Sequence, residues 1–408
     1  MLFRTSYKGF LACFAILFLL WGCDRGSQII SVEREDHFSL QIGRLEDQIT
    51  LFNLEGDRGI RRTGIAMRNG QFYIADGNGG KILRYNSYGD LLFMIYNDET
   101  NPPPMSLRPL SEDNLLTRWS VSYPLLEPGE ISVDSRQHIY VRDTLPYEKH
   151  TFDPESKVLL SNTVLHFDAN GRFLESLGRE GKGGKPFPII EKIFSSVRDE
   201  LAVVCRLPGG WDIYWYDADG NLLYLIQLKA DTLPIPTDRD DVFPSMDMIA
   251  ASPDSRVLYA KIDYYKNLYD ESTNTRIGIE QDSSVVWEMD VEVGLWDKPL
   301  DVPFYEYSYT EQNRKIIYRI PYSLLGVAKN GRIFFSFPVE GGYTILMMTS
   351  ETGSAGKHHQ GFIRVDDDEL QFNAFDLTAD GILSGLLVDD WQVKLVWWRT
   401  DKLLGDGF

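Results

Sequence analysis

Short apolar runs alternate with tight turns along most of this chain, and the clearest set lies between residues 64 and 96. Four runs of aliphatic, β-branched and aromatic residues occupy positions 64–67, 72–75, 81–85 and 91–96. Turns rich in glycine, asparagine and aspartate separate these runs. Runs of this length between such turns predict four antiparallel strands joined as a meander. Because one meander cannot bury both of its faces, its recurrence predicts blades packed around a ring.

The same pattern recurs along the rest of the chain, with a second clear copy from Gly129 and more degenerate copies after it. The segments are 64–96, 129–178, 193–228, 246–296, 323–365 and 372–404. We therefore predict an all-β fold, a six-bladed β-propeller of four-stranded antiparallel blades in a single domain over 37–408. A terminal strand often closes such a ring, so we expect part of 38–52 to join the blade that contains 393–398.

The first two copies resemble NHL repeats, a family of six-bladed propellers. The resemblance rests on Phe72-Tyr73-Ile74-Ala75-Asp76 in the first copy and His138-Ile139-Tyr140-Val141-Arg142-Asp143 in the second. The chain as a whole is also similar to uncharacterised propeller lipoproteins of spirochaetes. This resemblance implies a propeller at the cell envelope. Some relatives in related six-bladed groups are metal-dependent lyases or lactonases with ligands in the central channel, so an enzyme stays open as an alternative.

The N-terminus has the layout of a secretory signal. Arg4 and Lys8 precede an apolar run over 9–21, and Gly22-Cys23 follows. The segment 20–23 resembles a bacterial lipobox, whose cysteine becomes the lipidated N-terminus after cleavage. We therefore expect a lipoprotein signal peptide at 1–22, lipidation of Cys23 and a polar tether over 23–36. Two or more acyl chains would anchor the protein stably to a membrane of the bacterial cell envelope, facing the periplasm or exposed at the surface.

The cysteines predict one buried structural thiol, and the net charge argues against two classes of partner. Of the three cysteines, Cys13 lies in the leader and Cys23 is the expected lipid site, which leaves Cys205 within an apolar strand as a buried structural thiol. The formal net charge is −19, and the leader contributes the positive Arg4 and Lys8. An acidic surface repels nucleic acid and anionic lipid headgroups, so we expect neither as the main partner.

Long insertions gather on one side of the predicted ring. Successive strands of a meander run in opposite directions, so the loops between second and third strands share a face with the links between blades. Most long insertions are of these two kinds, over 97–128, 144–162, 231–244, 263–283 and 296–321. Period-two aromatics at 304–309 suggest an extra strand or an extended arm.

Elaborated loops on a rigid scaffold usually carry function, and aromatic residues with arginine are typical interface anchors. Packing of these aromatics among themselves is the alternative. The candidate binding face consists of Arg118, Trp119, Tyr123, Tyr147, Tyr264, Tyr265, Tyr269, Tyr305, Tyr307 and Tyr309.

Signals for catalysis are weak. None of the six histidines falls in a predicted innermost strand, and a channel metal would need several ligands that converge from different blades. The segment 217–221 starts like a calcium loop, but Leu222 and Leu228 occupy the positions of the required glycine and glutamate. We expect no catalytic residue, metal site or cofactor.

The sequence favours a non-catalytic binding scaffold, with envelope or outer-membrane proteins as partners. Two alternatives stay open: a metal-dependent hydrolase or lyase with a central-channel site, and a receptor for a glycan or another small ligand.

Overall fold

The computed structural model describes residues 30–51, 63–110, 117–237, 239–297, 299–311, 314–349 and 358–404. The predicted signal peptide and Cys23 lie outside these residues, as does Phe52 at the end of the expected closing segment. No helix in the described ranges is both long and apolar enough to cross a membrane.

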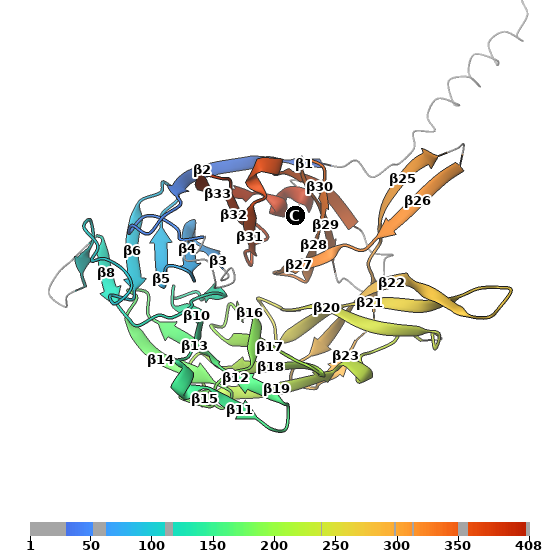
Figure 1. Ribbon diagram of the computed structural model, residues 1–408, viewed down its shortest axis with the longest axis horizontal. Helices are drawn as coiled ribbons and strands as arrows, with labels where there is room; N and C mark the ends of the chain where they lie inside the picture. Colours follow the sequence, from blue (N-terminus) through green and yellow to red (C-terminus); the bar gives the residue numbers. More distant parts are fainter. Residues whose placement is uncertain are drawn as a thin grey trace, which may run out of the picture.

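The described strands form antiparallel sheets arranged around a central axis, which is the architecture of a β-propeller (Figure 1). The prediction of an all-β propeller is therefore confirmed. Blade 1 contains β3 (Gly64–Arg68), β4 (Gln71–Asp76), β5 (Lys81–Tyr85) and β6 (Leu91–Tyr96). Blade 2 contains β9 (Ile131–Val133), β10 (Ile139–Thr144), β13 (Asn162–Phe167) and β14 (Phe173–Gly178). Blade 3 contains β16 (Ile189–Ser195), β17 (Leu201–Leu207), β18 (Gly210–Tyr216) and β19 (Leu222–Lys229).

Blade 4 carries the longest strands, and blade 5 gains an extra strand from the N-terminal part of the chain. Blade 4 contains β20 (Val242–Ala251), β21 (Val257–Tyr269) and β22 (Arg276–Asp290), and its outer position is shared by β23 (Leu295–Trp296) and β24 (Leu300–Asp301). Blade 5 contains β27 (Ser323–Ala328), β28 (Arg332–Val339), β29 (Gly342–Thr349) and β30 (His358–Arg364), with β1 (Ile30–Val32) added in parallel beside β30.

The two ends of the chain share the remaining sheet. It contains β31 (Phe372–Leu377), β32 (Leu383–Val388), β33 (Gln392–Trp398) and, outermost, β2 (Arg34–Gln41). β2 pairs antiparallel with β33, from Arg34 opposite Trp398 to Gln41 opposite Gln392. Closure of the ring by an N-terminal strand was predicted, although this strand begins at Arg34, before the expected segment.

The expected number of blades, six, was wrong. The described residues form five blades, and the remaining sheet combines three strands from 372–398 with β2 from the N-terminal part of the chain. After Trp398 the chain forms the short 3-10 helix η4 (Thr400–Leu404) instead of a fourth strand. The outer edge of β33 pairs with β2.

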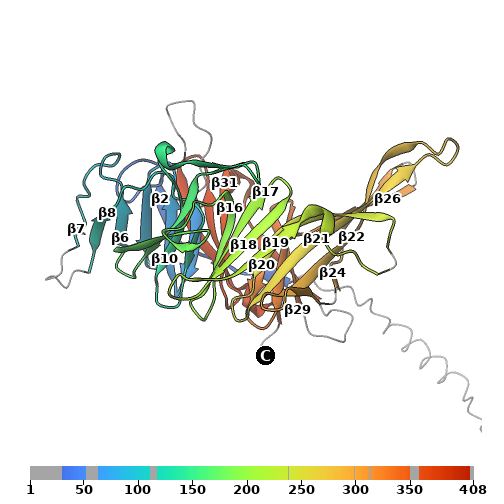
Figure 2. The ribbon, with the colours of Figure 1, turned by 90° about the horizontal axis from the view of Figure 1, so that it is seen from below.

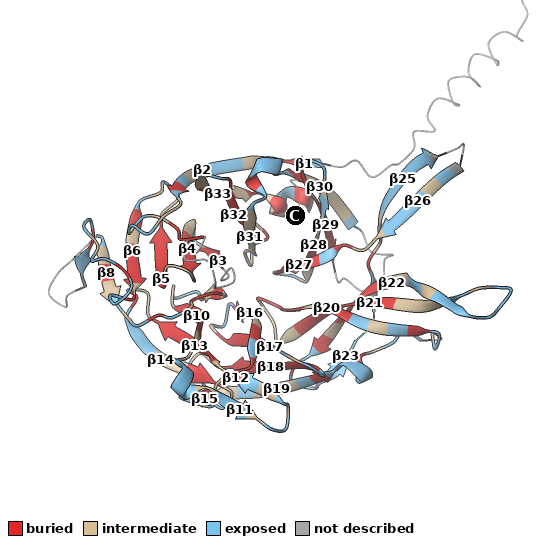
Figure 3. Ribbon diagram, viewed as in Figure 1, coloured by how far each residue is buried: buried red, intermediate tan, exposed pale blue. Residues whose placement is uncertain are grey.

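Apolar side chains fill the spaces between neighbouring blades. Between blades 3 and 4, for example, Trp215, Tyr264 and Trp287 belong to one buried cluster. Figure 3 shows that buried residues follow the blades, whereas the segments that project from the ring are exposed. Full burial of one large apolar side chain stabilises the fold by about 1.5–3 kcal/mol, so these clusters hold the ring together. Cys205 is buried within blade 3, and burial raises the pKa of its thiol, as expected for a structural cysteine.

Insertions decorate the ring between and within blades. The link after blade 1 forms β7 (Arg108–Pro109) and β8 (Trp119–Ser122), and β8 extends blade 1 in parallel beside β6. The remaining short elements are η1 (Tyr147–Lys149), β11 (Thr151–Asp153), β12 (Val158–Leu160), β15 (Gly181–Lys182), η2 (Ala230–Thr232), β25 (Tyr305–Glu311), β26 (Arg314–Ile320) and η3 (Asp367–Glu369). Seen on edge, the ring carries β7 and β8 at one end and the β21–β22 and β25–β26 hairpins at the other (Figure 2).

Candidate functional site

Two hairpins leave the ring beside blade 4 and blade 5 (Figures 1 and 2). The first is the outer half of β21 and β22, which have 13 and 15 residues. Both strands are buried near the ring, up to Tyr264 on β21 and from Ser284 on β22. We call the projecting part, residues 265–283, arm 1. Arm 2 is the hairpin of β25 and β26, which pairs with no other sheet among the described strands.

Arm 2 has one apolar face and one polar face. The register places Tyr307 opposite Tyr318 and Tyr309 opposite Ile316, so these side chains share a face. The other face is mainly polar: Glu306 and Arg319 form an ion pair there, and Ile317 is its one large apolar side chain among the described positions. Tyr307 is 54% exposed and Tyr318 is 49% exposed. The apolar face of arm 2 is therefore accessible to a partner.

Arm 1 also exposes apolar side chains. Leu268 and Tyr269 lie near the end of β21, and Ile277 and Ile279 lie on β22. All four are exposed, and Ile277 reaches 66%. Exposed β-branched and aromatic residues on two projecting hairpins are typical of an interaction surface.

The structure places five of the predicted binding residues on the arms. Tyr269, Tyr307 and Tyr309 are exposed there. Tyr265 is half-buried and stacks on Phe243, with ring centroids 5.9 Å apart. Tyr305 lies at the base of arm 2, where it stacks on Phe337 at 4.5 Å.

Tyr264 is a core residue instead. Its side chain is completely buried, and its hydroxyl accepts a hydrogen bond from Trp287 Nε1 at 2.8 Å and donates one to the carbonyl of Pro234. The burial of β21 ends at this residue, which sequence alternation does not reveal. Its prediction as part of an exposed face is therefore corrected.

The remaining predicted residues lie away from the arms. Trp119 stacks on Phe93, and its Nε1 donates to the carbonyl of Asn170 at 2.7 Å, which joins blade 1 to blade 2. Tyr123 packs edge-on against Phe167. Arg118 is exposed but donates from Nε to the carbonyl of Leu91, and Tyr147 is exposed on η1. Because β8 and the arms occupy opposite ends of the ring (Figure 2), the ten residues do not form one surface.

A second candidate site lies on the axis of the ring. Figure 1 shows β3, β16, β27 and β31 nearest the centre. These strands, with β9 and β20, line a cavity of about 120 Å³. The lining charged and hydroxyl residues come from β3, β31 and the strands of blades 2 and 3, and they include Arg68, Glu130, Ser132, Lys192, Ser195, Asp376 and Thr378.

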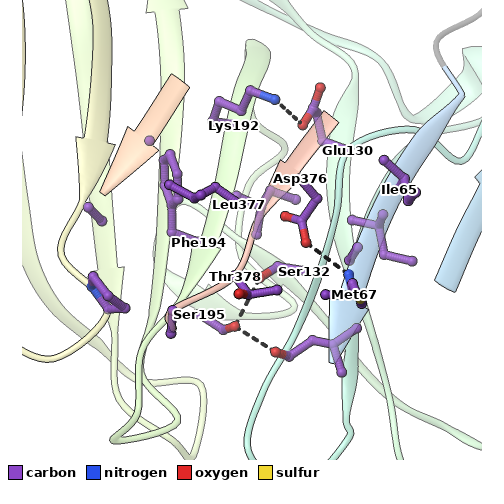
Figure 4. Close-up of a pocket in the computed structure, with 18 of the residues that line it drawn as sticks. Ile65, Met67, Glu130, Ser132, Lys192, Phe194, Ser195, Asp376, Leu377 and Thr378 are labelled. Atoms are coloured by element: carbon purple, nitrogen blue, oxygen red, sulfur yellow. Dashed lines mark hydrogen bonds and ion pairs between the residues drawn. The ribbon is translucent and has the colours of Figure 1, made fainter. Parts of the chain in front are cut away.

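Opposite charges meet in this cavity. Lys192 Nζ lies 3.1 Å from Glu130 Oε2. Figure 4 shows the carboxylate of Asp376 near this pair, where it accepts a hydrogen bond from the backbone N–H of Met67 at 2.8 Å. Burial raises the pKa of Asp376 to about 6, although the Met67 hydrogen bond and the charge of Lys192 oppose the rise. The raised pKa brings the protonation of Asp376 closer to neutral pH than that of an ordinary aspartate.

Sequence reasoning missed this polar cavity because it searched the innermost strands for histidine. The available signal was charge in or beside the predicted first strands: Lys192 lies one residue before the predicted segment 193–228, and Asp376 lies within the predicted segment 372–404. Both residues line the axial cavity.

A metal site is not apparent in the described ranges, which contain no group of three histidine, cysteine, aspartate or glutamate side chains placed to hold an ion. Two histidines do meet in blade 2, where His138 Nδ1 lies 3.0 Å from His166 Nε2. His166 Nδ1 lies 3.1 Å from Glu175 Oε1, and burial lowers the pKa of His166. This pair does not line the axial cavity.

Comparison with known proteins gives no family. No known family model matches the sequence, so the resemblance to NHL repeats stays a prediction. No curated protein matches the chain. Solved structures do align over most of it, at low similarity.

A hydrazine synthase from Kuenenia stuttgartiensis shares 14% identity over 88% of this chain and 81% of its own, with a TM-score of 0.40. A PL25 polysaccharide lyase that acts as an ulvan lyase shares 9% identity over 90% and 96%, with a TM-score of 0.41. A putative gluconolactonase shares 11% identity over 90% and 92%, with a TM-score of 0.38. Similarity at this level says nothing about activity, and the fold assignment rests on the sheet topology of the chain itself.

Proposed function

We propose that this protein is a lipid-anchored scaffold of the bacterial cell envelope that binds protein partners through its two arms and catalyses no reaction. The observation that carries the proposal is the apolar face of arm 2, where Tyr307 and Tyr318 lie opposite each other and stay exposed. Exposed apolar patches on soluble proteins commonly mark interaction sites. An isolated two-stranded hairpin is also only marginally stable in water, so a partner that covers this face would stabilise the arm.

A protein is the partner class that suits this face best. Tyrosine supplies a large contact area with few rotatable bonds, and truncation of one anchor at an interface costs about 2 kcal/mol or more. Strands of arm 2 also present backbone edges beside the tyrosines, which another chain can pair with. Exposed aromatics are compatible with a glycan as well, which keeps a glycan receptor as the alternative outcome.

The location at the envelope is part of the proposal. The signal pattern before Cys23 supports lipidation of that residue, and the tether over 23–36 would hold the ring near the membrane. A metal-dependent hydrolase or lyase with a site in the channel stays open as the enzyme alternative; among the described residues no three histidine, cysteine, aspartate or glutamate side chains are placed to hold an ion.

Site-specific photo-crosslinking in intact cells tests the proposal. A photoreactive phenylalanine analogue would replace Tyr307 or Tyr318 on arm 2, and Tyr88, which is 86% exposed on a blade 1 turn, would serve as the control position. Both arm positions should give an adduct with the same envelope protein, and the control position should not. Identical adducts from all three positions, or none from the arm, would contradict the proposed role of the arms.

A further inference from the structure

The axial cavity is separate from the arms and has the size of a small-molecule site. Its volume is about 120 Å³. A protein cavity of about 150 Å³ holds one benzene molecule, so a ligand of roughly five to six non-hydrogen atoms fits here. The polar lining residues are half-buried, which means that solvent reaches them from the channel.

The charged groups of the lining balance one another. Arg68 and Lys192 contribute positive charge, and Glu130 and Asp376 contribute negative charge. The lining therefore has no net charge that would attract a polyanion or a bare metal cation. A zwitterion can place its positive group near a carboxylate and its negative group near a cationic side chain, which favours it over ions of a single charge.

The hydrogen-bonding groups are partly unused. Asp376 Oδ2 accepts from Met67 N–H, and Oδ1 has no hydrogen-bond partner among the described residues. The Ser132 hydroxyl donates to Ser195 Oγ at 2.9 Å, and the Ser195 hydroxyl donates to the carbonyl of Val133 at 2.9 Å. Both hydroxyl hydrogens are therefore used, but the Ser132 Oγ can still accept a hydrogen bond from a ligand. Asp376 and Ser132 thus suit an ammonium group. Lys192 already donates to Glu130, but its ammonium group has three N–H donors, so it can also donate to a ligand carboxylate.

The opposite side of the cavity is apolar. Met248 of β20 and Leu325 and Val327 of β27 line it, and the charged lining residues come from other strands. A ligand with one polar end and one short apolar side chain matches this division.

We propose that the axial cavity binds a small α-amino acid with a short apolar side chain, its ammonium group on Asp376 and its carboxylate on Lys192. Ethylamine and propionate each carry one of the two charged groups of alanine. They should therefore bind more weakly than alanine itself.

Isothermal titration calorimetry of the purified protein with L-alanine, ethylamine and propionate tests this inference. Alanine should bind at pH 7.5, and Asp376→Asn and Lys192→Met should each weaken it at least tenfold. Alanine binding by the wild type should weaken between pH 7.5 and pH 5, and Asp376→Asn should lose this pH dependence. The arm variant Tyr307→Ser/Tyr318→Ser should bind alanine like the wild type, so failure of the cavity and failure of the arms are distinguishable.

Absence of binding by folded wild-type protein at millimolar alanine would overturn the inference. Equal affinity for alanine and ethylamine, or unchanged alanine affinity in both cavity variants, would overturn it as well. Circular dichroism identifies any variant that fails to fold, and in that case the three-ligand comparison and the pH dependence of the wild type decide the question.

Discussion

Glu369 contacts both the N-terminal strand β2 and the C-terminal strand β33, and its substitution should weaken the closure of the ring and lower the stability of the fold. The residue ends η3, which lies between β30 and β31, and its side chain is 1% exposed. Its carboxylate accepts hydrogen bonds from Arg34 Nη1 at 2.6 Å and Nη2 at 2.9 Å, and Lys394 Nζ lies 2.7 Å away. Arg34 belongs to β2 and Lys394 to β33, so one buried carboxylate connects the N-terminal strand to the C-terminal one.

The pKa of Glu369 gives the magnitude. Burial alone would raise it, but the hydrogen bonds from Arg34 and Lys394 prevail and lower the pKa from 4.5 to about 2. A shift of this size corresponds to about 3 kcal/mol of stability. Because the folded-state pKa lies below the unfolded one, this contribution is present above pH 4.5 and is lost as the pH falls from about 5 toward 2.

Glu369→Gln should therefore lower the free energy of unfolding at pH 7 by about 3–5 kcal/mol, the range for breaking a buried ion pair. Glu292→Gln is the matched control, since Glu292 pairs with Arg256 while its side chain stays 52% exposed. The control should change stability by about 1 kcal/mol or less. Urea denaturation at pH 7 and at lower pH measures both variants. Equal losses in the two variants, or a loss in Glu369→Gln that does not shrink as the pH falls, would refute this reasoning.

Two further substitutions test the packing of blades 3 and 4. Gly210→Ala would place a Cβ against the carbonyl oxygen of Leu228 across β18 and β19, so thermal unfolding should show a loss of about 1–3 kcal/mol. Gly209→Ala has no atom within 4 Å of the added Cβ and should stay within about 0.5 kcal/mol of the wild type; similar losses in both would exclude the steric explanation. Tyr264→Phe removes the hydroxyl that bonds Trp287 and Pro234 and should cost about 1–3 kcal/mol in urea denaturation, whereas the exposed Tyr269→Phe should be neutral. Equal stability of these two tyrosine variants would contradict the assignment of Tyr264 to the core.

The fold could be predicted largely from local sequence because strands and turns of a propeller are encoded blade by blade. The turn Asn69-Gly70 illustrates this, since both residues have positive φ, 52° and 70°, as a tight hairpin requires. Ring closure followed from the general architecture, and the aromatic alternation at 304–309 indicated the hairpin that became arm 2.

The exact boundary between ring and arm could not be predicted. Tyr264, Tyr265 and Tyr269 lie on one strand, and the tyrosines nearest the ring differ in burial because blade 3 covers Tyr264. The polar cavity was equally inaccessible, because Lys192, Glu130 and Asp376 come from three separate blades and meet when the ring closes. Such a juxtaposition depends on long-range topology that local periodicity does not contain.

The most direct test of the central claim compares the two faces of arm 2. Tyr307→Ser/Tyr318→Ser alters the apolar face, and Glu306→Gln/Arg319→Gln alters the opposite face of the same hairpin. Cross-linked affinity purification from intact envelopes, with partner recovery quantified against the wild type, measures both. Partner recovery should fall at least tenfold in the tyrosine variant and stay near the wild-type level in the charge variant, with equal thermal stability in all three proteins. Undiminished recovery with the tyrosine variant, or equal loss in both variants, would contradict binding through the apolar face of arm 2.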